Sequence, residues 1–118
     1  MTNKDFLTRW AAALQNRNPG VMTGLYAPNA VLLATLEAQP LVGQQAIFPY
    51  FAKLMETDGL AVRYDDLIPI AGPPMVSSAL GIVAGLYTFM LPAPTPARFT
   101  FVFREDGRIL HHHSSASP

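Results

Sequence analysis

The sequence has no cysteine and few charged side chains. Without cysteine, a disulfide framework, a zinc–thiolate site and a thiol nucleophile are all excluded. Lys, Arg, Asp and Glu make up 14% of the 118 residues, whereas an average soluble domain has about 25%. The 8 basic and 8 acidic side chains give a formal net charge of zero, so we expect neither nucleic acid nor an anionic membrane surface as a partner.

Long apolar runs are also missing from the sequence. No stretch approaches the ~18 consecutive apolar residues of a membrane-spanning helix. Lys4, Asp5 and Arg9 precede the first apolar run, which is not typical of a secretory signal. We therefore expect a soluble protein of the cytoplasm.

Hydrophobic side chains are abundant, at 50% of the residues, which excludes a disordered chain and a coiled coil. The length predicts one domain, residues 1–118, that buries about two thirds of its surface. With so little charge, part of the apolar excess is expected to contact a second subunit or to line a cavity. We therefore expect a homo-oligomer, and a dimer is the commonest form.

Apolar spacing predicts three helices in the first half of the chain. Thr2-x-x-Asp5 is a capping-box sequence that begins the first helix, which "NRNPG" (16–20) ends. Asn18 and Pro19 begin a short second helix that ends at Pro28-Asn29, and "AVLLA" (30–34) follows as a buried strand. The third helix runs from Gly43 to Asp58-Gly59, and Pro49 is expected in its first turn, where amides have no helical partner.

The second half of the chain changes character. Four apolar runs are separated by the turn sequences "AGPP" (71–74), "PAPTP" (92–96) and "EDG" (105–107), which predicts an antiparallel meander. Gly81 and Gly85 interrupt the second run and indicate bulges or bends. The order of elements predicts an α+β fold with the helices gathered on one face of a curved sheet.

Three consecutive histidines near the end of the chain belong either to the fold or to a purification tag. The strand predicted at 97–104 needs a partner, and 108–115 runs back beside it after the turn at "EDG". Tags usually carry six or more histidines. We therefore predict a final strand whose two faces are Leu110, His112 and Ser114 on one side and Ile109, His111, His113 and Ser115 on the other.

Several stretches occur in an order that points to a known family. They are Trp10, "LYAPNAVLL" (25–33), "GQQAIFPYF" (43–51), "GLYTF" (85–89), "RFTFVF" (98–103) and a C-terminal His-x-His-x-Ser-x-x-Pro pattern formed by His111, His113, Ser115 and Pro118. Together they resemble the bacterial stand-alone relatives of the calcium/calmodulin-dependent protein kinase type II association domain. This group belongs to the nuclear transport factor 2-like and SnoaL-like superfamily. The resemblance covers nearly the whole chain.

The resemblance implies a cone-shaped α+β domain in which three N-terminal helices pack on a strongly curved, mainly antiparallel sheet around a deep pocket. In the kinase, the domain assembles subunits into rings, and arginines line its pocket. An ungapped comparison of the last two strands places two of those arginine positions on Arg98 and Ser114 of this chain. No kinase domain is present, so kinase activity is not implied.

We expect the pocket to bind a small anionic or carboxylate-bearing ligand. Arg98 would supply a planar fork of donors, although an arginine at a strand edge can also extend into water. His112 and Ser114 would lie beside it, under apolar walls drawn from Trp10, Tyr26, Tyr50 and Phe51. An ordinary aromatic core is the favoured interpretation of Trp10 and Tyr26, although either could form a pocket wall with its polar tip inward.

Two further function classes remain open. An isomerase or cyclase of the SnoaL-like or ketosteroid-isomerase-like kind would use Asp65, Asp66 or His112 as its acid or base, with one aspartate facing inward if its strand alternates regularly. Two acidic residues at a solvated strand end are the competing interpretation. A scaffold for another protein is the third class.

No cofactor or metal ion is expected. His111 and His113 share a strand face, but two neutral imidazoles alone hold a metal weakly, so structural roles are favoured. We expect subunits to meet through the outer rows of the meander, led by Phe99, Phe101 and Phe103.

Overall fold

The computed structural model describes residues 2–70 and 81–118. The predicted turn at 71–74 lies outside these residues. The helices and strands are α1 (Asn3–Gln15), α2 (Pro19–Gly24), β1 (Tyr26–Leu33), β2 (Leu41–Val42), α3 (Gln44–Leu54), β3 (Ala61–Ile70), β4 (Ile82–Met90), β5 (Pro94–Phe103) and β6 (Ile109–Ala116).

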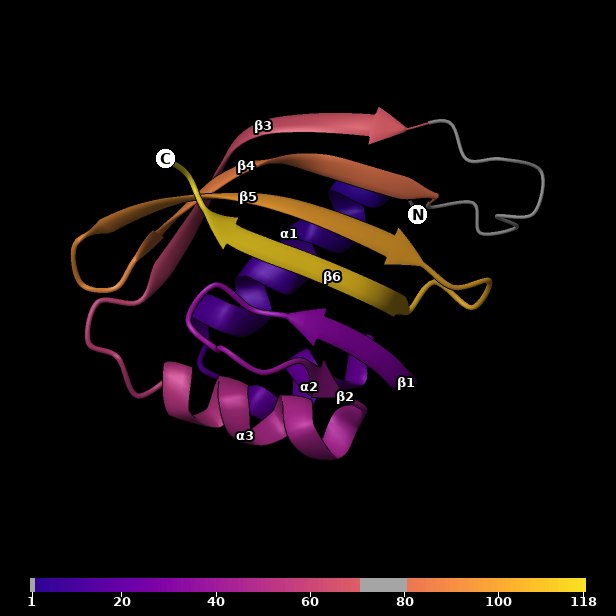
Figure 1. Ribbon diagram of the computed structural model, residues 1–118, viewed down its shortest axis with the longest axis horizontal. Coiled ribbons are helices and arrows are strands. Elements are labelled where there is room, and N and C mark those ends of the chain that lie inside the picture. The colour runs from indigo at the N-terminus through magenta and orange to yellow at the C-terminus, as the bar shows by residue number, and fades with distance from the viewer. Residues whose placement is uncertain (1, 71–80) are drawn as a thin grey trace.

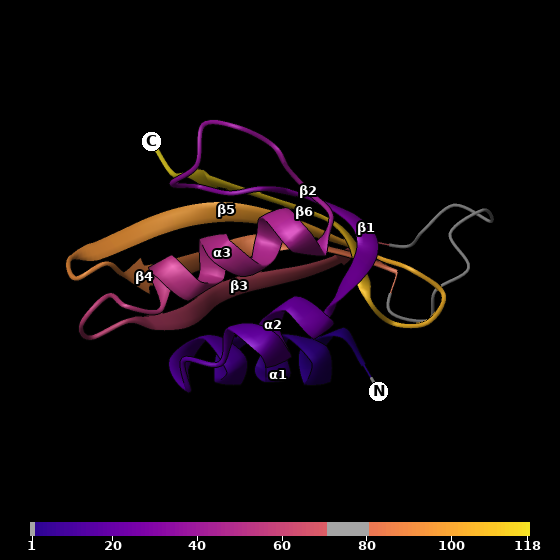
Figure 2. The same cartoon turned by 90° about the horizontal axis from the view of Figure 1, so that it is seen from below.

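The predicted α+β class is confirmed, and residues 2–70 and 81–118 contain three helices and a six-stranded mixed sheet of order β2-β1-β6-β5-β4-β3. Strands β3 to β6 form the expected antiparallel meander, and β6 also pairs with β1 in parallel. In Figure 1, α1 lies behind β4 to β6, and none of the described helices lies in front of these strands. Figure 2 shows α1 and α2 together on one side of the sheet. No helix in the described part of the chain is long and apolar enough to cross a membrane.

Local sequence chemistry sets where the first two helices begin. Thr2 Oγ1 accepts a hydrogen bond from the Asp5 amide at 3.2 Å, and the Asp5 carboxylate accepts one from the Thr2 amide at 2.9 Å, so the predicted capping box is confirmed. Asn18 caps α2 through the Val21 amide. Helix α2 ends at Gly24, earlier than predicted, and Pro28 lies within β1.

Two prolines lie inside regular elements, at positions that differ from the sequence prediction. Both are tolerated because the missing proline amide leaves no buried backbone group without a hydrogen bond. Pro28 is exposed, in the part of β1 where its pairing with β6 shifts register, so the missing amide breaks no ladder bond. Pro49 lies in the second turn of α3, not in the first. The carbonyl that it deprives of a partner belongs to Gln45, which is exposed and therefore open to water.

A bulge in β3 lies one position from a glycine of β4, Gly85, which pairs with Leu67. Tyr64 pairs with Tyr87 but Asp66 pairs with Leu86, so β3 has one extra residue at this point. A Cβ atom added to Gly85 would lie 2.1 Å from the Asp66 carbonyl oxygen. Strand β4 pairs regularly through Gly85, so the irregularity predicted there lies instead in the neighbouring strand β3, whose bulged backbone approaches Gly85 closely.

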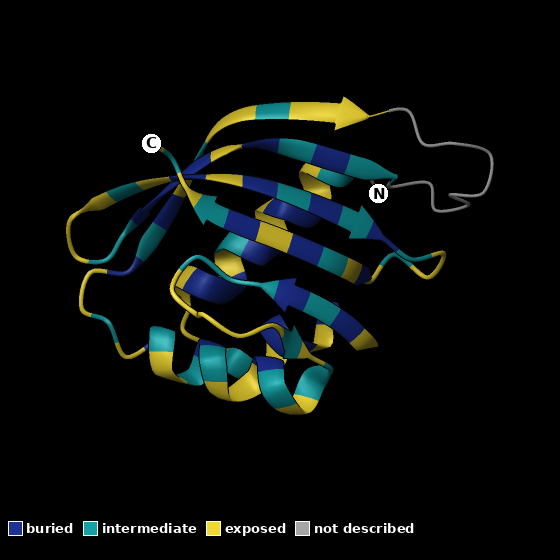
Figure 3. Ribbon diagram, in the orientation of Figure 1, coloured by how far each residue is buried: buried dark blue, intermediate teal, exposed yellow. Residues whose placement is uncertain are grey.

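The core lies between the sheet and α1, as the dark ribbon segments of Figure 3 show. Phe99, Phe101 and Phe103 all belong to it, with at most 3% of their surface exposed. The prediction that these phenylalanines form an outer row is wrong, because β5 alternates in the opposite phase. The rings of Phe99, Phe101 and Phe103 contact one another along the strand.

The histidine run belongs to the fold, as predicted. Strand β6 lies between β1 and β5, and His112 pairs with Leu32 on one side and Phe101 on the other. His112 and Ser114 face the core as expected. Ile109 joins them there and Leu110 is exposed, contrary to prediction, because the pairing shifts register between Val102 and Phe103.

We expect Gly85→Ala to destabilise the fold by about 2 kcal/mol or more, since an overpacked interior site costs about 1–3 kcal/mol and here the new methyl group meets backbone. Gly24→Ala is the matched control, because no atom lies within 4 Å of a Cβ added there. Urea denaturation of both variants measures the difference. Equal unfolding free energies for the two would contradict the close approach.

Candidate functional site

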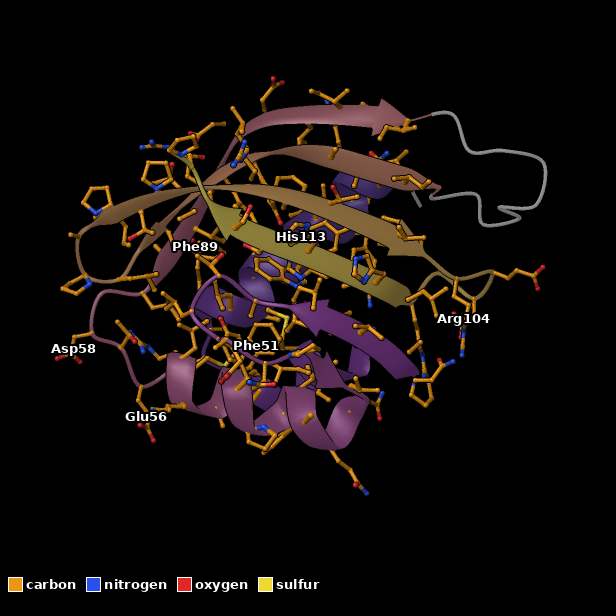
Figure 4. All side chains as sticks on the ribbon, in the orientation of Figure 1. Phe51, Glu56, Asp58, Phe89, Arg104 and His113 are labelled. Carbon is orange, nitrogen blue, oxygen red and sulfur yellow. The ribbon has the colours of Figure 1, made fainter. Side chains whose placement is uncertain are left out.

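A small cavity lies between α1, α3 and the inner face of the sheet. Its volume is about 20 Å³, which is room for about one water molecule. Figure 4 shows two of its apolar walls, Phe51 on α3 and Phe89 on β4. Its polar side chains include Thr35, Tyr87, His112 and Ser114, and Trp10 and Tyr50 also line it.

His112 is the centre of a buried hydrogen-bonded chain. Its Nδ1 lies 2.9 Å from the Tyr26 hydroxyl, and its Nε2 lies 3.0 Å from the Tyr87 hydroxyl. Trp10 Nε1 donates to Tyr26 at 3.1 Å, and Tyr87 donates to Ser114 at 2.6 Å. The ring of His112 stacks on Phe101, with centroids 4.0 Å apart.

The donor inventory of this chain fixes the direction of each bond. Tyr87 donates its hydrogen to Ser114, so its oxygen accepts from His112 Nε2–H. Nδ1 of the neutral ring then accepts from the Tyr26 hydroxyl, whose oxygen accepts from Trp10. Ser114 and Thr35, whose hydroxyls are also hydrogen-bonded, end the chain. The six side chains have one polar hydrogen each, but only 5 hydrogen bonds join them. One hydroxyl hydrogen, of Ser114 or Thr35, is therefore left over. The cavity therefore offers a donor to its occupant.

Burial keeps every titratable member of this chain neutral. It lowers the pKa of His112 to about 3, since the charged ring would lose its hydration, and the neighbouring His111 and His113 act in the same direction. Burial raises the pKa of Tyr26 and of Tyr87 well above the ordinary value of 10. It also raises the pKa of Tyr50 to about 12, with help from Glu37. The interior thus presents dipoles and no charge.

A wider groove lies outside the cavity. It has a volume of about 490 Å³ and is lined by α3 and by the segment before it, including Glu37 and Lys53. Leu36, Tyr50 and Leu54 line both spaces and so form the partition between them.

The structure brings most of the predicted ligand-binding residues together. The cavity is lined by Trp10, Tyr50, His112 and Ser114. Tyr26 is not among the lining residues, but its hydroxyl is hydrogen-bonded to His112. Arg98 does not join them: it is exposed on the outer face and pairs with Ser115. The prediction that Arg98 faces the pocket is wrong. Successive residues of a strand face opposite sides of the sheet, and Phe99, next to Arg98 in β5, faces inward.

Neither predicted aspartate reaches the cavity. Because Asp65 occupies the bulge of β3, regular alternation is lost and both Asp65 and Asp66 are exposed. Asp65 forms an ion pair with Arg63 at 2.7 Å and accepts a hydrogen bond from Thr88 at 2.6 Å. These bonds lower the pKa of the Asp65 carboxyl, which is the opposite of what a general base near neutral pH needs.

Sequence reasoning missed two members of the site, Tyr87 and Thr35. Tyr87 lies in "GLYTF", where alternation with the inward Phe89 was an available signal. Thr35 lies in the loop after β1 and reaches Ser114 across 79 positions of sequence, so no local pattern indicates it.

Comparison with known proteins identifies the class of fold first. No protein-family model matches the sequence, and no curated protein matches it. A nuclear transport factor 2-like protein of unknown function from Cytophaga hutchinsonii superposes with a TM-score of 0.76, at 13% identity over 100% of this chain and 92% of that one. A steroid delta-isomerase from Pseudomonas aeruginosa gives 0.72, at 15% identity over 98% and 80%. The fold is therefore that of the nuclear transport factor 2-like superfamily.

One solved structure is similar enough in sequence to identify the family. It is described as a calcium/calmodulin-dependent protein kinase II association domain from Xanthomonas campestris, and it is 32% identical over 96% of this chain and 84% of that one, with a TM-score of 0.71. The chain belongs to this association-domain family, within the nuclear transport factor 2-like and SnoaL-like superfamily, which confirms the resemblance seen in the sequence.

We expect stability to fall as the pH is lowered from about 6.5 to 4.5. Over this range the unfolded chain takes up a proton at His112 while the folded chain, with a pKa of about 3, does not, so the free energy of unfolding decreases by up to about 1.4 kcal/mol per pH unit. Carboxylates such as Asp65 and Asp106, whose pKa values are lowered, contribute mainly below this range. Denaturant titrations at several pH values measure the slope.

His112→Gln keeps a donor and an acceptor but cannot take up the proton. Its free energy of unfolding should therefore depend less steeply on pH than that of the wild type. The exposed His113→Gln is the control and should keep the steeper slope. Identical slopes for the wild type and His112→Gln would contradict the buried, neutral imidazole.

Proposed function

We propose that this chain is a homodimeric domain that binds a small uncharged molecule carrying a hydrogen-bond acceptor. The observation that supports it most is the spare hydroxyl hydrogen of Ser114 or Thr35, which both line a cavity whose other walls are largely apolar. A carbonyl oxygen accepts such a hydrogen and needs no donor partner of its own. A hydrocarbon would leave the hydroxyl without a partner.

The ligand is neutral because the cavity has no charge to offer. None of the described residues that line it is an arginine, lysine or carboxylate. A buried carboxylate without a cation costs several kcal/mol. An anionic ligand was expected from the sequence because Arg98 was placed in the pocket. Since Arg98 faces outward, the proposed ligand carries a neutral acceptor instead of a carboxylate.

Binding requires movement of the partition. The inner cavity holds only about one water molecule, whereas small-molecule sites typically measure about 300–1,000 Å³. Displacement of Leu36 and Tyr50 would join it to the groove of about 490 Å³. The ligand then extends from the hydroxyls of the cavity floor toward Lys53 and Glu37 at the rim.

The outer face of the sheet supports dimerisation. Leu86, Ile68 and Ile70 are 42%, 53% and 43% exposed, and in register Ile70 lies beside Ile82 and Ile68 beside Ala84. In the next row Asp66 and Arg98 flank Leu86. A two-fold axis near Leu86 would place the aspartate of each copy against the arginine of the other, which makes the face self-complementary.

Acid–base catalysis has weaker support. Both nitrogens of His112 are engaged and its pKa is about 3, so it is poorly suited to exchange protons near neutral pH. Asp65 and Asp66 are on the outside. The likeness to a steroid isomerase is at 15% identity, which speaks for the fold alone.

We expect acetophenone to raise the melting temperature more than ethylbenzene or benzoate does. The three are similar in size, and the ketone gains a hydrogen bond worth about 1 kcal/mol over the hydrocarbon, or about fivefold in affinity, without the cost of burying a charge. Thermal shift measures the melting temperatures, and calorimetric titration measures the affinities.

Ser114→Val should abolish the acetophenone effect, because it removes a hydroxyl and fills the cavity. Ser115→Val is the matched control on the opposite face of β6 and should respond like the wild type. A larger shift with benzoate than with acetophenone would contradict a neutral ligand.

We expect light scattering to return twice the chain mass of 12.8 kDa at micromolar concentration. Leu86→Glu should weaken the dimer by at least about tenfold, because a buried carboxylate without a partner costs more than about 1.4 kcal/mol. Val21→Glu, at a residue that is 53% exposed on α2, is the control and should remain dimeric. A wild-type mass of one chain would refute the proposed interface.

A further inference from the structure

Two histidines of β6 take no part in the interior chain. His111 and His113 lie at i and i+2 of the strand, on the outer face, whereas His112 between them points inward. A strand rises about 3.3 Å per residue, so their Cα atoms are about 6.6 Å apart and their side chains leave the sheet in the same direction. Figure 4 labels His113 on the visible face of β6.

The ring of His111 has a fixed orientation. Its Nδ1 lies 3.1 Å from the backbone carbonyl oxygen of Val31 in β1. Because a carbonyl only accepts, Nδ1 must carry the hydrogen, and Nε2 of the neutral ring keeps its lone pair. Imidazoles that bind metals are typically held in this way, with the other ring nitrogen donating to a carbonyl or carboxylate.

The direct strand partners of the two histidines are uncharged, and the first cation along the outer row of β5 is Arg98, which pairs with Ser115. In register, His111 lies between Val31 and Val102, and His113 lies between Leu33 and Thr100. His113 is exposed, so its ring can rotate toward its neighbour. No cation stands next to either ring in these pairs to repel a metal ion.

We propose that His111 and His113 together bind one divalent ion of the late first-row transition metals. His111 contributes Nε2, His113 contributes one ring nitrogen, and water fills the other positions, since no group of three or more potential ligands exists among the described residues. Imidazole nitrogen suits copper, nickel and zinc rather than calcium or magnesium, and affinity peaks at Cu²⁺. The sequence alone favoured structural roles, because it could not show how His111 is oriented.

Titration of the tag-free full chain with CuCl₂ and ZnCl₂, followed by calorimetry and, for copper, by visible absorption, tests the site. We expect saturable binding that is tighter for Cu²⁺ than for Zn²⁺. His111→Ala and His113→Ala should each weaken it by at least about tenfold, since a chelate of two ligands loses one. Ser115→Ala, on the same face of β6, should bind like the wild type.

Circular dichroism of each variant confirms that the fold is retained, and His113→Gln provides a second variant that removes the ligand but not the polarity. Because both histidines lie on the proposed dimer face, the same titration is repeated with Leu86→Glu. Retained binding there supports a site made by one chain. Loss of binding in that variant, equal binding by His113→Ala and Ser115→Ala, or no saturation at millimolar metal would each overturn the proposal.

Discussion

The interior of this protein depends on the hydrogen bonds that satisfy His112. Its ring is almost completely buried and neutral, so each nitrogen needs a partner inside the protein, and a missing one would cost about 1–3 kcal/mol. The partners come from β1 and β4, and the first of them is itself bound by Trp10 of α1. The hydrogen bonds of this one side chain therefore link α1, β1 and β4 to its own strand, β6.

The same constraint shapes what the protein can bind. The chain of neutral dipoles has one hydrogen more than its bonds use, and this hydrogen belongs to Ser114 or Thr35, which both line the cavity. Selectivity for an acceptor thus arises without any charged residue. On its other face β6 carries His111, which is partly buried, and His113, which is exposed, so one strand contributes to both the interior site and the outer face of the sheet.

Sequence patterns predicted the elements well where local chemistry decides them. The capping box at Thr2, the cap at Asn18 and the final strand through His112 are of this kind. The sequence patterns failed where the direction of a side chain depends on a neighbouring strand. Arg98 and the phenylalanines of β5 were assigned to the wrong faces because alternation gives two phases and does not say which one faces the helix. Asp65 was misplaced because nothing in β3 itself reveals a bulge whose space is provided by Gly85.

The position of β6 between β1 and β5 also has a consequence for how the chain folds. His111 and its β1 contact Val31 are 80 positions apart, so β1 has no partner on that side until most of the chain has been synthesised. The meander of β3 to β6 can form from neighbouring segments, whereas the parallel pair must close a long loop, which is entropically costly and slow. During that interval one edge of β1 is an open strand edge, a template for pairing with other chains. The first strand of a nascent chain of this protein is thus open to misassembly until β6 has been made.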